Sequence, residues 1–170
     1  TQIVAPVAAE LVALDTAPKT LALARSRLAN AAVRFFVADA YQLPPDLGEF
    51  DAALAAFWFS HVPLARRHEF LVGLASVLAP GGRVVLVDNR YVEGNSTPLC
   101  GRDPAGNSYQ LRRLADGSSH RVLKNFPTEV ELRSAVAGAG ERFRFTLFDY
   151  YWAVEFDTLG GSHRRDVAQS

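Results

Sequence analysis

Two aspartates near the start of the chain each close a short apolar run, and both could hold a nucleoside. Asp15 ends the run Leu-Val-Ala-Leu, and Asp39 with Ala40 ends a run that begins at Val33. A carboxylate can accept two hydrogen bonds from a ribose diol. A carboxylate beside a backbone amide can bind the amine and a ring nitrogen of adenine. Structural roles stay open for each residue, with Asp15 or Thr16 capping a helix and Asp39 starting a turn.

An aromatic run follows a later apolar segment and leads into a histidine. The run is Phe57-Trp58-Phe59, followed by Ser60 and His61. Neighbouring members of such a run point in opposite directions, so part of it packs in the core and the rest can line a cleft, where a ring attracts a cation. His61 is a candidate general base for a hydroxyl or an amine, and a histidine at a helix edge is the alternative.

Other catalytic patterns are missing from the sequence. No Cys or His spacing predicts a metal site. The serine elbow, the P-loop and the zinc-protease helix motif are also absent, which leaves hydrolase, nucleotide kinase and zinc-protease functions without their chemistry.

The residues that position these groups alternate between strand-like and helix-like segments up to Asp88. This alternation predicts an α/β fold: a Rossmann-like, mostly parallel sheet with helices on both faces, whose ligands bind beyond the C-terminal ends of the strands. The expected elements are the end of a helix over 2–10, strands over 11–14, 33–37, 51–57 and 83–88, a helix beginning after Asp15 or Thr16, a loop over 42–49, and a helix over 64–78 that is stopped by 79–82. We expect the strands over 51–57 and 83–88 to be buried, the latter on both faces.

The pattern changes after Asp88. We expect a loop over 89–107, a β-hairpin formed by 109–114 and 120–126, a helix from Thr128 to about 139 with Glu131 in a capping box, and an antiparallel pair of strands over 142–156 at the sheet edge. Residues 91–126 are predicted to form a lid over a small-molecule acceptor. Tyr91, Tyr109 and Arg112 are its candidate contacts, whereas the cationic cluster Arg112, Arg113, Arg121 and Lys124 is expected to be a solvated hairpin face.

Composition sets outer limits. The 170 residues, 49% of them hydrophobic, suit a single domain with a real core, and eighteen acidic and eighteen basic residues give no net charge and no sign of a nucleic-acid surface. A single cysteine, Cys100, favours a reducing compartment, so we expect a cytoplasmic protein. No apolar run is long enough for a membrane span. A homodimer is compatible with the sequence.

Four segments in register resemble the class I S-adenosylmethionine-dependent methyltransferases of the small-molecule type. They are Leu-Val-Ala-Leu-Asp15, Val-Ala-Asp39-Ala-Tyr-Gln-Leu-Pro44, Phe50-Asp51 leading to Ala-Ala-Phe-Trp-Phe-Ser-His61, and Leu78-Ala-Pro-Gly-Gly-Arg-Val-Val-Leu-Val-Asp88. The resemblance implies methyl transfer from S-adenosylmethionine (SAM), a seven-stranded sheet with one antiparallel strand, and cofactor contacts from Asp15, Thr16, Asp39, Ala40, Phe57 and Trp58. His61 would then lie in the cleft shared by donor and acceptor.

The family's glycine-rich loop and first strand have no counterpart in the chain, and Thr1 would fall just after them. We therefore expect residues 1–170 to be one methyltransferase domain without these two features, and a longer parent protein to contain them. Two alternatives remain at this point. One is a fragment of an NAD(P)-dependent oxidoreductase, which uses the same missing loop, and the other is a non-catalytic relative that binds a partner through residues 109–126.

Overall fold

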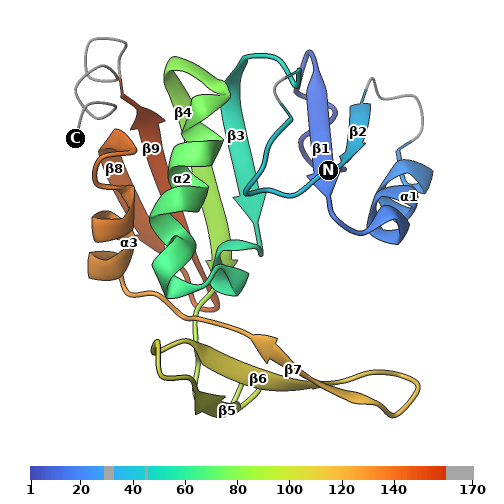
Figure 1. The fold of residues 1–170 in the computed structure, drawn as a ribbon, viewed down its shortest axis with the longest axis vertical. Coiled ribbons are helices and arrows are strands. Elements are labelled where there is room, and N and C mark those ends of the chain that lie inside the picture. The colour runs from blue at the N-terminus through green and yellow to red at the C-terminus, as the bar shows by residue number, and fades with distance from the viewer. Residues whose placement is uncertain (29–32, 45, 160–170) are drawn as a thin grey trace. The chain divides into compact units, whose positions relative to one another are not determined.

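The computed structural model describes residues 1–28, 33–44 and 46–159 (Figure 1). Pro45 of the expected loop and residues 160–170 of the expected domain lie outside the described residues. The chain divides into two compact units, 1–48 and 49–170, and each is described by itself.

The first unit contains two parallel strands and one helix, as the sequence predicts. Strands β1 (Leu11–Asp15) and β2 (Val33–Val37) pair in a register that sets Asp15 opposite Val37. The helix α1 (Pro18–Ser26) buries Leu21. Because parallel strands run the same way, the residues that follow β1 and β2 lie at the same edge of this pair.

Two expectations for the first unit are wrong. Residues 2–7 form turns rather than the end of a helix. The N-cap of α1 is Ala17, which makes no side-chain cap, and neither Asp15 nor Thr16 takes that position. Pro18 explains the shift, because its fixed φ and missing N–H make it the first residue inside the helix.

The second unit is built on a four-stranded sheet in the order β3-β4-β9-β8. Its strands are β3 (Phe50–Ala56), β4 (Leu78–Asn89), β8 (Gly140–Leu147) and β9 (Tyr151–Thr158). Strand β3 runs parallel to β4, and β9 runs antiparallel to both of its neighbours. The expected antiparallel pair over 142–156 is confirmed, but only β8 stands at the edge, and β9 lies inside the sheet (Figure 1).

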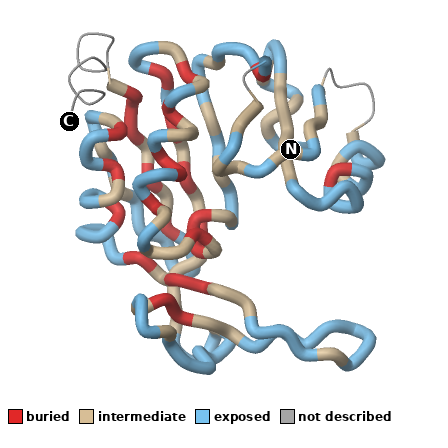
Figure 2. The backbone as a smooth tube through the Cα atoms, in the orientation of Figure 1, coloured by how far each residue is buried: buried red, intermediate tan, exposed pale blue. Residues whose placement is uncertain are grey.

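The core of the second unit lies on one face of this sheet, under the helices α2 (Arg67–Ser76) and α3 (Glu129–Val136) (Figures 1 and 2). Along β4, Val84 and Leu86 are buried, whereas Val85 and Val87 between them are half-buried. The expectation that residues 83–88 are covered on both faces therefore does not hold within this unit. Nor is β3 buried, because it is an edge strand of the sheet and leaves Leu54 49% exposed.

Helix boundaries also differ from those expected. The segment over 64–78 begins with a 3₁₀ turn, η2 (Leu64–Arg66), and α2 ends at Ser76. Residues 79–82 do not form a separate stop, because they belong to the start of β4, where the pairing with β3 shifts register. The capping box of Thr128 and Glu131 is confirmed, but α3 ends at Val136, ahead of Gly138 in the left-handed region at φ +83°.

A second, three-stranded antiparallel sheet follows β4. It consists of β5 (Leu99–Arg102), β6 (Ser108–Arg113) and β7 (Ser119–Leu123). The hairpin of β6 and β7 is confirmed, but β5 lies in a segment expected to be a loop. A register shift at Cys100 and the positive φ of Gly101 let this irregular stretch pair with β6. Figure 1 shows this small sheet beyond the C-terminal ends of β3 and β4.

No helix within the described ranges is long and apolar enough to cross a membrane.

Candidate functional site

The carboxylates of Asp15 and Asp39 follow neighbouring strands and share one local geometry. Oδ1 of Asp15 accepts a hydrogen bond from the amide of Ala17 at 2.7 Å, and Oδ1 of Asp39 accepts one from the amide of Tyr41 at 2.9 Å. The carbonyl of Asp15 accepts from the amide of Ala38, which ties the two strand ends together. Each carboxylate is thus oriented through one oxygen, and Oδ2 has no hydrogen-bond partner among the described residues. A carboxylate held in this way can still accept hydrogen bonds through its second oxygen.

The aromatic run after β3 divides between the core and the surface. Phe59, the first residue of the 3₁₀ turn η1 (Phe59–His61), is fully buried and packs edge-on against Trp152. Phe57 is 50% exposed, contacts the ring of Tyr151, and has the left-handed φ of +57°. Trp58 packs against Phe70 of α2. The left-handed φ of Phe57 costs free energy in a residue other than glycine, and such backbone strain is concentrated at functional sites.

His61 is held by the small sheet. Its Nδ1 lies 2.7 Å from the carbonyl oxygen of Leu123, the last residue of β7. A carbonyl oxygen can only accept, so Nδ1 carries the proton and Nε2 of the neutral ring keeps a free lone pair. Burial, and next the positive charge of Lys124, lower the pKa of His61 below its ordinary 6.5. The ring is therefore neutral at neutral pH, in the tautomer that a base acting through Nε2 needs.

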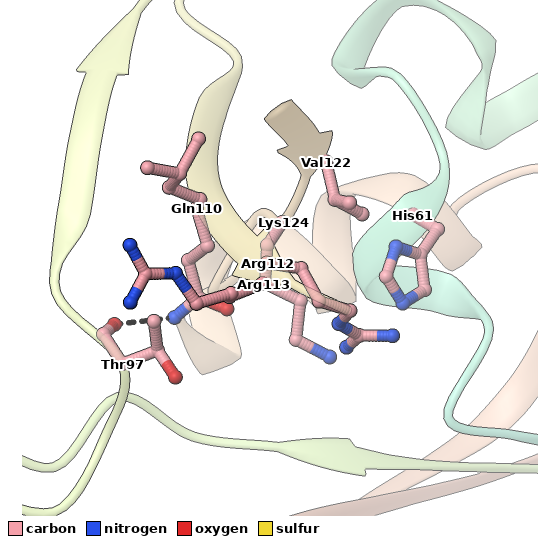
Figure 3. A pocket seen from close by; sticks show the side chains of 8 residues that line it. His61, Thr97, Gln110, Arg112, Arg113, Val122 and Lys124 are labelled. Atoms are coloured by element: carbon pink, nitrogen blue, oxygen red, sulfur yellow. Dashed lines mark hydrogen bonds between the residues drawn. The ribbon is translucent and has the colours of Figure 1, made fainter. Parts of the chain in front are cut away.

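A hollow of about 210 Å³ lies between His61 and the small sheet (Figure 3). Its lining residues are His61, Thr97, Gln110, Leu111, Arg112, Arg113, Val122 and Lys124. Of the three acceptor contacts expected from the sequence, the structure brings only Arg112 to this hollow.

The two tyrosines expected to contact the acceptor are engaged elsewhere. Tyr91 packs edge-on against Phe126 with ring centroids 5.3 Å apart. The hydroxyl of Tyr109 donates to Oδ2 of Asp103 at 3.0 Å, and this hydrogen bond raises the pKa of Tyr109. Tyr109 therefore holds its proton at neutral pH and is not a competing base.

A buried polar cluster that the sequence did not predict joins β4 to the small sheet. Nζ of Lys124 donates to Oγ of Ser60 at 2.7 Å, to Oδ1 of Asp88 at 3.1 Å and to Oδ1 of Asn89 at 3.2 Å. The amide of Ser60 donates to the other oxygen of Asp88 at 2.8 Å. Lys124 is only 6% exposed, so its assignment to a solvated hairpin face is wrong.

The segment after β7 is anchored a second time by Asn125. Its Oδ1 accepts from the amide of Ser108 at 2.9 Å, and its Nδ2 donates to the carbonyl of Val62 and to Oδ1 of Asn107. The two anchors make the small sheet and the turn that carries His61 one hydrogen-bonded assembly. Within the described ranges, no group of three or more His, Cys, Asp or Glu side chains could hold a metal ion.

The methyltransferase domain family matches residues 1–82. The chain is 34% identical over 157 residues to the demethylmenaquinone methyltransferase of Thermus thermophilus, and the match covers 84% of this chain and 68% of that protein. The chain belongs to the class I SAM-dependent methyltransferases. A second methyltransferase, the ubiquinone/menaquinone biosynthesis C-methyltransferase of Azotobacter vinelandii, is 30% identical over 145 residues, which cover 77% of this chain and 55% of that one.

Solved structures agree with this methyltransferase assignment. The DhpI–SAH complex matches with a TM-score of 0.72 at 26% identity, over 93% of this chain and 70% of that one. The DhpI-SAM-HEP complex matches with a TM-score of 0.74 at 26% identity, over 91% and 71%. The cofactor of this methyltransferase is SAM, and its reaction is methyl transfer to a small molecule. Family membership decides against the oxidoreductase alternative.

Proposed function

We propose that this methyltransferase acts on a hydroxyl or an amine whose proton is taken by Nε2 of His61. The observation that carries the proposal is the 2.7 Å hydrogen bond between Nδ1 of His61 and the carbonyl of Leu123, because it leaves Nε2 as the basic nitrogen. The lowered pKa of His61 supports the same role, since an unprotonated ring is ready to accept a proton at neutral pH.

We further propose that Asp15 and Asp39 hold the nucleoside of SAM. The free oxygen of Asp15 would accept from the ribose hydroxyls, with Thr16 beside it. Asp39 and the amide of Ala40 would bind the edge of the adenine. Two features support this assignment. Both carboxylates lie at the C-terminal ends of neighbouring parallel strands, and each accepts a hydrogen bond from the backbone amide of the second residue after it.

When bound, SAM supplies a methyl group on a sulfonium, which needs alignment more than activation. In the proposed reaction, a lone pair of the acceptor oxygen or nitrogen would bond to the methyl carbon, and the electron pair of the broken sulfur–carbon bond would stay on sulfur. Nε2 of His61 would take the proton that the acceptor loses. Phe57 and Trp58 are proposed to place aromatic rings near the positively charged sulfonium. Residues 91–126 would form the wall that positions the acceptor and excludes water.

Calorimetric titration with S-adenosylhomocysteine tests the nucleoside contacts. The variants are Asp15→Ala and Asp39→Ala, and the matched control is Asp116→Ala. Asp116 orients its carboxylate in the same way, through the amide of Ser118 at 2.9 Å, but lies in the β6–β7 turn. We expect the first two variants to weaken binding at least about tenfold, the equivalent of 1.4 kcal/mol, and the control to leave it unchanged. Unchanged binding in Asp15→Ala would overturn the nucleoside assignment.

A further inference from the structure

We infer that the hollow beside His61 binds an acid group of the methyl acceptor, with Arg112 as its anchor. The inference rests on the proposed function in one respect: the bound acid group belongs to the methyl acceptor only if His61 is the base that acts on that acceptor. It specifies the substrate class as a small molecule that carries a carboxylate or a phosphate-like group close to the hydroxyl or amine that is methylated.

The register of the small sheet directs one row of side chains toward His61. In β6 and β7, Gln110 pairs with Val122 and Arg112 pairs with His120. Residues two apart on a strand share a face, so Gln110 and Arg112 lie on the same side of the hairpin. Figure 3 shows the Arg112 side chain extending toward His61, whereas the Arg113 side chain extends the other way, toward Thr97.

The charges around the hollow are all positive or neutral. No acidic residue is among its lining residues. Lys124 is already paired with Asp88 at 3.1 Å. The guanidinium of Arg112, by contrast, forms no ion pair with any described carboxylate. A planar guanidinium that no protein group occupies is suited to two parallel hydrogen bonds with the oxygens of an acid.

The electrostatic effect of Arg112 on His61 agrees with this placement. Arg112 is among the charges that lower the pKa of His61, after burial and Lys124. An anion bound at Arg112 would offset that charge, so it would raise the pKa of His61 and strengthen Nε2 as a base. The acid group would thus assist the proton transfer as well as orient the acceptor.

The dimensions of the hollow favour a small molecule over a nucleic acid. Its volume of about 210 Å³ is enough for a small organic acid, and the lining cations that form no ion pair with a described carboxylate are two adjacent arginines, Arg112 and Arg113. A nucleic-acid surface would instead present a row of cations that neutralises several phosphates. Arg121, an exposed arginine on the neighbouring strand of the hairpin, lies over the ring of Tyr109 at 3.8 Å.

Nuclear magnetic resonance titrations with inorganic phosphate and with acetate, in the absence of SAM, test the inference. We expect saturable shifts of the His61 ring and the Arg112 Nε–H, and an increase in the pKa of His61 at saturation. Arg112→Gln should weaken binding at least about tenfold, and Arg112→Lys should do so less, because it keeps the charge but loses the paired hydrogen bonds. Tighter binding of phosphate would indicate a phosphate-like acceptor, and equal or tighter binding of acetate would indicate a carboxylate.

The matched control is Arg121→Gln. It removes the same charge from the neighbouring strand, but Arg121 does not line the hollow and lies instead over the ring of Tyr109. Equal weakening by Arg112→Gln and Arg121→Gln would show that the attraction is non-specific, and the inference would fail. So would the absence of a saturable shift at about 100 mM anion, a hundred times a dissociation constant of about 1 mM.

This titration contains no cofactor and no methyl transfer, so its failure is separate from failure of the proposed function. Saturable phosphate binding with loss in Arg112→Gln would support the acid site even if Asp15→Ala left S-adenosylhomocysteine binding unchanged.

Discussion

Nζ of Lys124 lies 3.1 Å from Oδ1 of Asp88, and neither side chain has more than 8% of its surface exposed. The two residues are 36 positions apart in the sequence, one in β4 and the other directly after β7. Because Leu123 precedes Lys124 and holds His61, this ion pair fixes the segment that orients the proposed base. The ion pair therefore stabilises the fold and also orients the side chain that we propose as the base.

We predict that Lys124→Met destabilises the protein by about 3–5 kcal/mol, because it leaves the Asp88 carboxylate buried without a compensating charge. Urea denaturation followed by circular dichroism measures the loss. Glu129→Gln is the control, since Glu129 and Arg133 form an exposed pair one helical turn apart. This change leaves Arg133 over the ring of Phe143 and should cost only about 0.3–0.5 kcal/mol.

The double variant Asp88→Asn with Lys124→Met separates charge from packing. If the uncompensated carboxylate causes the loss, the double variant should recover a substantial part of it. A double variant as unstable as Lys124→Met alone would point to lost packing instead.

Methyl transfer should rise with pH through the lowered pKa of His61 and level off near neutrality. Stability should follow the same direction. The folded pKa lies below the unfolded value of about 6.5, so in this window the unfolded chain binds more protons and the free energy of unfolding increases with pH. Denaturation midpoints of the native protein and His61→Gln between about pH 5 and 8 test this. An unchanged pH slope in the variant would contradict the assignment.

Two glycines of the second unit should respond oppositely to alanine. A Cβ at Gly140 would clash with the ring of Phe156 and would lie 2.6 Å from the carbonyl oxygen of Asp157, so Gly140→Ala should cost about 1–3 kcal/mol or more. A Cβ at Gly73 in α2 meets nothing within 4 Å, so Gly73→Ala should stabilise by about 0.4–1 kcal/mol. Thermal unfolding of both variants checks the pair, and a stable Gly140→Ala protein would refute the close approach of β8 and β9.

The parts of the fold that follow from local signals were predicted well. The apolar runs that end at Asp15 and before Asp39 are strands, residues 109–113 and 119–123 pair in the expected hairpin, and the Thr128 capping box begins the expected helix. Helix ends were less accurate. Pro18 moved the start of α1, and the continued pairing of β4 drew residues 79–82 into a strand.

The site was predicted only in part, because its decisive contacts join residues far apart in the sequence. The hydrogen bond between Lys124 and Ser60 joins residues 64 positions apart, and the one between His61 and Leu123 joins residues 62 positions apart. Lys124 read alone resembles one more surface cation of a hairpin. A usable signal was Asp88 at the end of a buried strand, because a buried carboxylate requires a partner.

The position of β9 has a consequence for biosynthesis. Strand β4 takes its parallel partner, β3, from earlier residues, but its other edge is covered by residues 151–158. While the ribosome is still translating the intervening segments, the apolar β4 exposes unpaired backbone groups that could pair with another nascent chain. The sheet can therefore form completely only after β9 has been translated. Truncation of the chain before Tyr151 should yield a product that aggregates instead of a smaller folded protein.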